Sequence, residues 1–241
     1  KQVFGTEGAV RGLVRVAQDG KDKSRGNACM AIGNLCDEDD AQSEIDRVVL
    51  RQHKTQLLEV EGAMWALVQT AVECGPDVAV QACRSIATVL WAHKGTKEAL
   101  CGLDGALRDM IGIGGIQGHK AVAVACSVIA NAADVAGCTA RLIVKIASCE
   151  GAIDTMVRVV LDQERDRKAG CEAARALANI SEPLSAREDD EEAAARMRKD
   201  GANHRAGGVD PEELRGWIMN AKGATTALVR ACVSGSDEAK E

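Results

Sequence analysis

The chain has almost no aromatic side chains: 241 residues contain no Tyr, one Phe and three Trp. Large rings dominate most globular cores, so their scarcity favours closely packed helices built on Ala, Val, Leu, Ile and Cys. An apolar run of about 18 residues, which a membrane-spanning helix requires, is also missing. The pattern of a secretory signal peptide is absent as well. We therefore expect no membrane insertion.

Positive charge is not in excess, because the formal net charge is −6. A general nucleic-acid binder is therefore not expected. The ten cysteines show neither a CxxC pair nor a regular framework, which argues against a disulfide scaffold. Most of them fall on apolar helix faces, as free thiols do in a reducing compartment. This predicts a cytoplasmic protein, and the nucleus is compatible with the same composition.

What the sequence does contain is a motif pair that recurs along the chain. Gly-Ala opens an apolar stretch at Gly8, Gly62, Gly105 and Gly151, and again at Gly223. A stretch of small residues follows the first four copies, at Ala28–Asn34, Ala82–Thr88, Ala125–Asn131 and Ala173–Asn179. Such self-similarity at a nearly regular spacing along the chain predicts a stacked helical repeat. The long surface of such a protein favours binding over catalysis.

Both motifs have a helical period. After each Gly-Ala glycine, apolar residues recur at helical spacing, as in Val10, Leu13, Val14 and Ala17. In the stretches that follow, small side chains lie four positions apart: Cys29 with Gly33, Cys83 with Ala87, Cys126 with Ala130, and Ala174 with Ala178. Small residues at this spacing let a neighbouring helix approach closely.

Three helices in each repeat of about 42 residues, with Gly-Ala before the second helix, resemble the armadillo repeat family. Glu7–Val16 and Glu150–Val159 are similar to the second helix of that family, and Ala173–Ser181 is similar to its third. The resemblance covers most of the chain. It implies an all-α fold, a right-handed α-solenoid with three helices per repeat.

We expect residues 1–241 to form a single armadillo-repeat domain, a fragment of a longer protein. Residues 1–37 are a partial first repeat, and residues 38–91, 92–133 and 134–181 are the second, third and fourth. Residues 182–209 are a charged insertion, and residues 210–241 a partial fifth repeat whose helix restarts at Asp210 and Pro211. Gly8 and Gly62 are 54 residues apart, so Ser43–Val60 is expected to lengthen the first helix of the second repeat.

The resemblance also implies a binding surface, because armadillo third helices line a concave groove that holds extended peptides. Residues 4, 7 and 11 positions before the end of each small-residue stretch share its helix face. The candidate peptide-binding residues are Lys23, Asn27, Met30 and Asn34; Gln81, Arg84 and Thr88; Lys120, Ser127 and Asn131; and Lys168, Arg175 and Asn179. Asp77, Val124 and Glu172 complete these faces. The resemblance implies that Asn34, Asn131 and Asn179 hydrogen-bond the main chain of a peptide.

This face is more positive than the chain as a whole. It carries Lys23, Arg84, Lys120, Lys168 and Arg175 against Asp77 and Glu172. We therefore expect it to prefer an acidic or phosphorylated segment of a partner protein; the alternative is a solvated face of mixed charge. Importin-alpha-type adaptors place Trp where this chain has Met30, Arg84, Ser127 and Arg175, so binding of a basic nuclear-localisation signal is not expected.

Three functions remain open. The first is a non-catalytic scaffold or adaptor that binds an extended, acidic peptide in the groove. The second is a structural subunit of a large assembly, held by its convex or end surfaces. The third rests on residues 179–229, which resemble the UCS domains of myosin chaperones: a charged segment follows an Asn-containing third helix, and a helix then leads to the Gly-Ala at Gly223. That resemblance implies a myosin co-chaperone.

We find no constellation that points to catalysis, a metal or a cofactor. The histidines His53, His93, His119 and His204 are scattered without ligand spacing. Cys29, Cys83 and Cys126 recur at equivalent helix positions, which indicates packing. Gly112–Gly118 resembles a phosphate loop but follows no strand, so we expect it to join the second and third helices of its repeat. Trp65, Trp91 and Trp217 are expected to pack between repeats.

Overall fold

The computed structural model describes residues 8–38, 41, 43–117, 119–134, 136–162, 165–181 and 216. The charged insertion beyond Ser181, the helix start at Asp210 and the fifth Gly-Ala at Gly223 lie outside these residues, as do His204 and Trp217. The described residues form eleven α-helices and no strand. The prediction of an all-α protein is confirmed.

The helices fall into repeating groups. The first group holds α1 (Ala9–Asp19) and α2 (Asp22–Cys36), and the second holds α3 (Glu44–Leu58), α4 (Ala63–Glu73) and α5 (Pro76–Leu90). The third holds α6 (Lys94–Gly102), α7 (Ala106–Gln117) and α8 (His119–Ala133), and the fourth α9 (Ala140–Ala147), α10 (Ala152–Leu161) and α11 (Arg167–Ser181). Helix α3 has 15 residues where α6 and α9 have 9 and 8, so the extra length expected within 43–60 is helical. The repeat boundaries stay a prediction.

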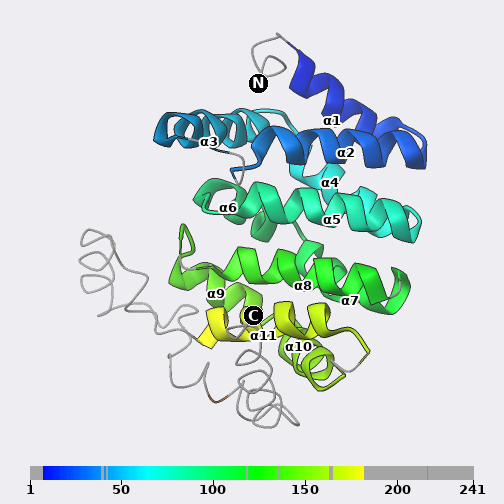
Figure 1. Ribbon diagram of the computed structural model, residues 1–241, viewed down its shortest axis with the longest axis vertical. Helices are drawn as coiled ribbons and strands as arrows, with labels where there is room; N and C mark the ends of the chain where they lie inside the picture. The colour runs from blue at the N-terminus through cyan, green and yellow to red at the C-terminus, as the bar shows by residue number, and fades with distance from the viewer. Residues whose placement is uncertain are drawn as a thin grey trace.

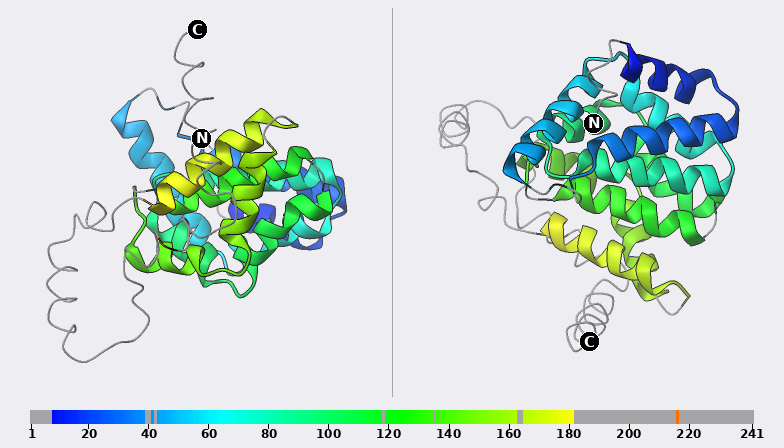
Figure 2. Two further views of the ribbon diagram at one scale, coloured as in Figure 1. Left: turned by 90° about the horizontal axis from the view of Figure 1, so that it is seen from below. Right: turned by 45° about the horizontal axis from the view of Figure 1, so that its top comes forward.

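The groups stack along the long axis of the molecule (Figure 1). The third helices α2, α5, α8 and α11 pack side by side in chain order, as Figure 2 shows from blue to yellow. The second helices α1, α4, α7 and α10 form another row, and the first helices α3, α6 and α9 a third. Each repeat thus packs on its sequence neighbours, so the structure is an α-solenoid. In the described part of the chain, no helix combines the length and hydropathy that a bilayer crossing requires.

The recurring Gly-Ala is explained by the backbone that precedes each second helix. Gly8, Gly62 and Gly151 are the N-caps of α1, α4 and α10, with φ angles of 80°, 75° and 75°. Gly105, which precedes α7, has a φ of 79°. A Cβ atom is unfavourable in this left-handed conformation. The turn into the second helix therefore selects glycine in each repeat.

The small residues of the third helices allow α2 and α5 to pack closely, as predicted. A Cβ atom on Gly33 would lie 2.8 Å from Oγ of Ser85 and 3.0 Å from its Cα. One on Gly26 would lie 2.6 Å from Oε1 of Gln81. Because interiors are close-packed, Gly33 has no room for a side chain, and one on Gly26 would have to displace the end of the Gln81 side chain. Cys29, Cys83 and Cys126, the cysteines of this stripe, are buried in the core.

One expectation from the sequence is wrong, and another is not settled. Gly112–Gln117 is not a connection but the second half of α7, because Met110 and Ile113 continue a helical apolar face that is fully buried. Trp65 and Trp91 are not fully buried, since they remain 37% and 43% exposed, and their packing between repeats stays a prediction. Trp65 belongs to α4, and Trp91 follows the end of α5.

Candidate functional site

The candidate residues form four rows across the stacked third helices, which we call the third-helix face. Each of α2, α5, α8 and α11 has 15 residues. Lys23, Asp77, Lys120 and Lys168 all occupy the second position of their helix, and Asn34, Thr88, Asn131 and Asn179 all lie near its end. Positions that the sequence placed on one helix face therefore align from repeat to repeat.

The first row is exposed and positive. Lys23, Lys120 and Lys168 are exposed in the first turn of a helix, where the unsatisfied N–H groups already give positive potential. Helix α8 has no acidic residue in that turn, whereas α2 and α5 have Asp22 and Asp77 there. At α11 the carboxylate of Asp166 accepts a hydrogen bond from the N–H of Ala169. These lysines form no ion pair within the described part of the chain. Lys120 therefore adds its charge to a helix N-terminus with no carboxylate in its first turn, a combination that attracts anions, while carboxylates offset the lysine charge at α2 and α11.

Arg175, by contrast, is half-buried and held by two side-chain partners. Its Nε and Nη2 donate to Oε2 of Glu172 at 3.0 Å and 2.6 Å. Its Nη1 donates to Oδ1 of Asn131, in the preceding repeat, at 2.8 Å. The charges of Arg175 and Glu172 thus neutralise each other, so Arg175 is not the free cation that the sequence suggested. Their spacing of three on one helix is a recognised signal for such a pair, and it was available in the sequence.

The amides of the last row bridge third helices. Nδ2 of Asn131 donates to the carbonyl of Ala87 at 2.9 Å, and Nδ2 of Asn179 donates to the carbonyl of Ala130 at 2.9 Å. These are equivalent contacts one repeat apart. Because Asn131 is only 8% exposed and both ends of its amide are bonded, it would bind a peptide only by giving up these contacts. The peptide-binding role of these residues stays a prediction, and Asn34, which is exposed, remains accessible for it.

The other two rows are accessible to different degrees. Asn27, Met30 and Arg84 are exposed, and Gln81, Thr88 and Ser127 are half-buried. Val124 is buried. After the Arg175–Glu172 pair is removed from the balance, Lys23, Arg84, Lys120 and Lys168 face Asp77 alone. The net positive excess of the third-helix face is therefore the same as the sequence suggested, but it is carried by Lys23, Arg84, Lys120 and Lys168 without Arg175.

The cysteines that recur on the third helices are packing residues. Burial raises the pKa of Cys29 to about 11 and the pKa values of Cys83 and Cys126 to about 12. A thiol is a nucleophile or metal ligand only when deprotonated, so these three are inert. Among the residues that the structure describes, no group of three or more His, Cys, Asp and Glu is arranged to hold a metal ion.

No protein-family model matches the chain, and no curated protein matches it. Among solved structures, an engineered protein from the Northeast Structural Genomics Consortium is similar, with a TM-score of 0.60 at 18% identity. The match covers 92% of this chain and 51% of the other, so the chain spans about half the length of that protein. A second engineered protein from the same consortium has a TM-score of 0.51 at 17% identity, over 93% of this chain and 96% of its own.

The fold is an armadillo-like α-solenoid. This conclusion rests on the three-helix repeats and on the glycine that precedes each second helix. The similarity to the two engineered proteins, at 18% and 17% sequence identity, concerns the fold alone. A designed armadillo repeat protein in complex with the peptide (KR)4 is also similar, with a TM-score of 0.48 at 20% identity over 92% of each chain.

Proposed function

We propose that this armadillo-like chain is a non-catalytic interaction scaffold whose third-helix face binds an extended, acidic or phosphorylated segment of another protein. The observation that supports the proposal is a set of exposed cations, Lys23, Arg84, Lys120 and Lys168, which form no ion pair among the described residues. They lie on stacked helices of successive repeats. Carboxylates and phosphates form charge-assisted hydrogen bonds with such groups.

The distance between neighbouring third helices determines how many peptide residues lie between successive contacts. Packed helices lie about 8–10 Å apart, and an extended chain advances about 3.3 Å per residue. A peptide that crosses the third helices therefore passes about three residues per repeat. Lys120 and Lys168, in adjacent repeats, would face acidic residues about three positions apart. We expect the amides of Asn27, Asn34 and Gln81 to pair with the peptide main chain.

A titration by fluorescence anisotropy tests the proposal. The probe is a labelled peptide of about twelve residues with Glu at every third position. The variant Lys120→Glu/Lys168→Glu should bind at least about tenfold more weakly than wild type. The control Arg11→Glu/Arg141→Glu makes the same charge change at exposed positions of α1 and α9 and should bind as wild type. Equal weakening in both variants would mean that only net charge matters, which contradicts the proposal.

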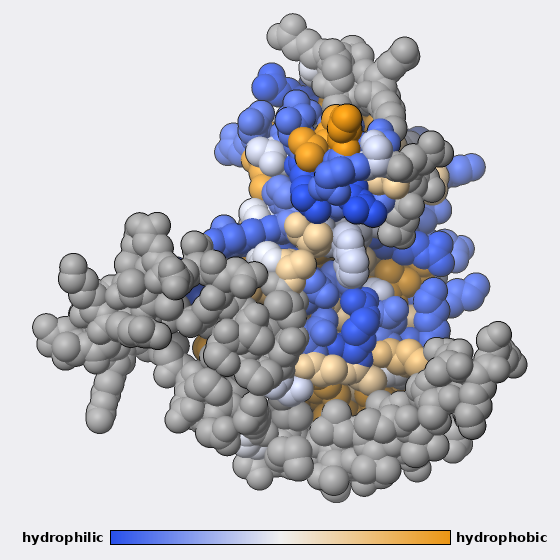
Figure 3. Space-filling model, turned by 60° about the vertical axis from the view of Figure 1, so that its left-hand side comes forward, coloured by the Kyte–Doolittle hydropathy of each residue, from blue (hydrophilic) through white to orange (hydrophobic). Residues whose placement is uncertain are grey.

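The alternative of a structural subunit is supported by a different surface. Helix α3 exposes two large aliphatic side chains, Ile45 at 77% and Val48 at 46%. The side of the molecule that carries α3 shows an apolar patch bordered by hydrophilic surface (Figure 3). Sedimentation velocity of wild type beside Ile45→Lys/Val48→Lys distinguishes the two functions: association that the variant abolishes would favour the subunit. The UCS-like co-chaperone function rests on residues mostly outside the described part, and it stays a prediction.

A further inference from the structure

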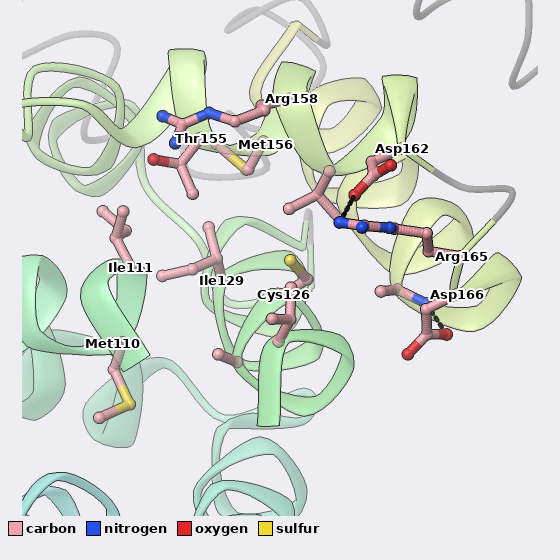
Figure 4. A pocket seen from close by; sticks show the side chains of 14 residues that line it. Met110, Ile111, Cys126, Ile129, Thr155, Met156, Arg158, Asp162, Arg165 and Asp166 are labelled. Atoms are coloured by element: carbon pink, nitrogen blue, oxygen red, sulfur yellow. Dashed lines mark hydrogen bonds and ion pairs between the residues drawn. The ribbon is translucent and has the colours of Figure 1, made fainter. Parts of the chain in front are cut away.

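A pocket of about 250 Å³ lies between the third and fourth repeats. Its walls come from α7, α8, α10 and the start of α11 (Figure 4). The lining residues of α8, among them Cys126 and Ile129, lie on the side of that helix away from Ser127 and Asn131. The pocket is therefore separate from the third-helix face.

The second half of α7 is rich in glycine, with Gly112, Gly114 and Gly115. Met110 and Ile111 line the pocket, and one helical turn further the chain has Gly114, where α10 has Val160 at the equivalent position. A Cβ atom on Gly112 would meet no atom within 4 Å. Gly112 and Gly114 thus add no side chain to this part of α7. Sequence reasoning missed this site because the pocket depends on how α7, α8, α10 and α11 pack together.

The floor of the pocket is apolar, with Met110, Ile111, Ile129, Met156 and Val159. Thr155, half-buried on α10, stands beside it (Figure 4). An apolar floor of this kind gains free energy by excluding water when it is covered by apolar surface.

The charged side chains at the rim of the pocket differ in the partners that they already have within the chain. Asp162 pairs with Arg165 at 3.5 Å. Oδ1 of Asp166 accepts a hydrogen bond from the main-chain N–H of Ala169 at 3.0 Å. The formal charges of the rim sum to zero, because Asp162 and Asp166 balance Arg158 and Arg165. Arg158 is nevertheless exposed and without an ion pair among the described residues, so it is the rim charge that an anionic neighbour would pair with.

We propose that this pocket takes one large apolar side chain of a partner protein, and that an acidic residue next to it in the partner pairs with Arg158. The volume lies below the range of about 300–1,000 Å³ that suits drug-sized ligands. It suits a single anchoring side chain of the kind that dominates protein interfaces. The solenoid then has two separate contact sites, and this one does not depend on what the third-helix face binds.

Methionine methyl NMR tests the proposal in the intact chain. Met110 and Met156 line the pocket, while Met30 lies exposed on the third-helix face, so the three methyl signals report on different surfaces. The probe is the blocked tripeptide N-acetyl-Glu-Trp-Glu-amide, with the Glu-Ala-Glu peptide as its control. We expect the Met110 and Met156 signals to shift and saturate with the Trp peptide only, and the Met30 signal to stay in place.

Two variants locate the binding. Thr155→Trp fills the pocket and should abolish the shifts, and Arg158→Glu should weaken binding at least roughly fivefold. Arg141→Glu, exposed on α9 and outside the pocket, should bind as wild type. Arg158 is exposed, so its variant stays informative even if Thr155→Trp does not fold. Static Met110 and Met156 signals in wild type would overturn the proposal, as would unchanged affinity in Arg158→Glu. Saturation by 2-naphthoate but not by the peptide would also overturn it, in favour of a small amphiphile.

Discussion

Nζ of Lys97 donates to the main-chain carbonyl of Asp134 at 2.8 Å and so joins α6 to the end of α8. It also donates to the carbonyl of Ala136 at 2.6 Å, and the lysine is fully buried. One repeat earlier, Nζ of Lys54 donates to the carbonyl of Trp91, which follows α5, at 2.7 Å. Both lysines lie eight residues before a Gly-Ala glycine. A first-helix ammonium thus caps the C-terminal end of the third helix of its own repeat.

Replacing Lys97 should therefore cost stability. Lys97→Met leaves the carbonyls of Asp134 and Ala136 without this partner, and we expect it to lower the free energy of unfolding by about 2–3 kcal/mol. Lys94→Met, at an exposed position of the same helix, should change it by less than about 0.5 kcal/mol. Urea denaturation followed by circular dichroism measures both. Similar small changes would show that the cap is dispensable.

His93 should make stability depend on pH. Burial lowers the pKa of His93 below its ordinary value of 6.5, and the nearby Lys54 ammonium lowers it further. The Glu38 carboxylate has a smaller opposing effect, and Arg51 a still smaller lowering one. Nδ1 of His93 accepts a hydrogen bond from the N–H of Thr96 at 3.2 Å as the N-cap of α6, which also requires the neutral ring.

Because the folded state holds this proton less tightly than the unfolded state, the stabilisation is complete above about pH 6.5 and declines as the pH falls below it. His93→Asn keeps an N-cap acceptor but does not titrate. We expect the melting temperature of wild type to fall more steeply than that of the variant between about pH 7.5 and pH 5.5. Parallel curves would show that His93 does not carry the effect.

Two glycines with opposite surroundings test the close packing of α2 on α5. Gly33→Ala forces a Cβ against Ser85 and should destabilise the protein by about 1–3 kcal/mol. A Cβ atom on Gly12, within α1, would meet no atom within 4 Å, so Gly12→Ala should stabilise by roughly 0.5–1 kcal/mol. Thermal denaturation of both variants decides, and a stabilising Gly33→Ala would refute the packing argument.

The buried thiols should resist modification. Burial raises the pKa of Cys83 to about 12, whereas Cys149 is only half-buried. Maleimide labelling of the native protein, mapped by mass spectrometry, should modify Cys149 at least about tenfold faster than Cys83. In denaturant the two rates should converge. Equal rates in the native protein would mean that Cys83 is accessible.

Backbone constraints made the repeat readable from the sequence. A left-handed turn selects glycine, and close helix packing selects small residues such as Gly33, so both leave a periodic record. The hydrogen bonds between side chains of the third-helix face left a weaker record in the sequence. Asn131 and Arg175 look like free polar groups, because their contact joins residues 44 apart and depends on how two repeats stack. Lys97 reads as a surface residue, since lysine is almost never fully buried unless paired.

The most direct test of the central claim is to locate an acidic peptide on the protein. The periodic-Glu peptide, carrying one benzophenone side chain, is photo-crosslinked to the chain, and the adducts are mapped by mass spectrometry. We predict adducts on α2, α5, α8 and α11 around Lys23, Arg84, Lys120 and Lys168, which Lys120→Glu/Lys168→Glu should suppress. Adducts concentrated on the first or second helices, and unchanged in that variant, would contradict the assignment of the third-helix face as the binding surface.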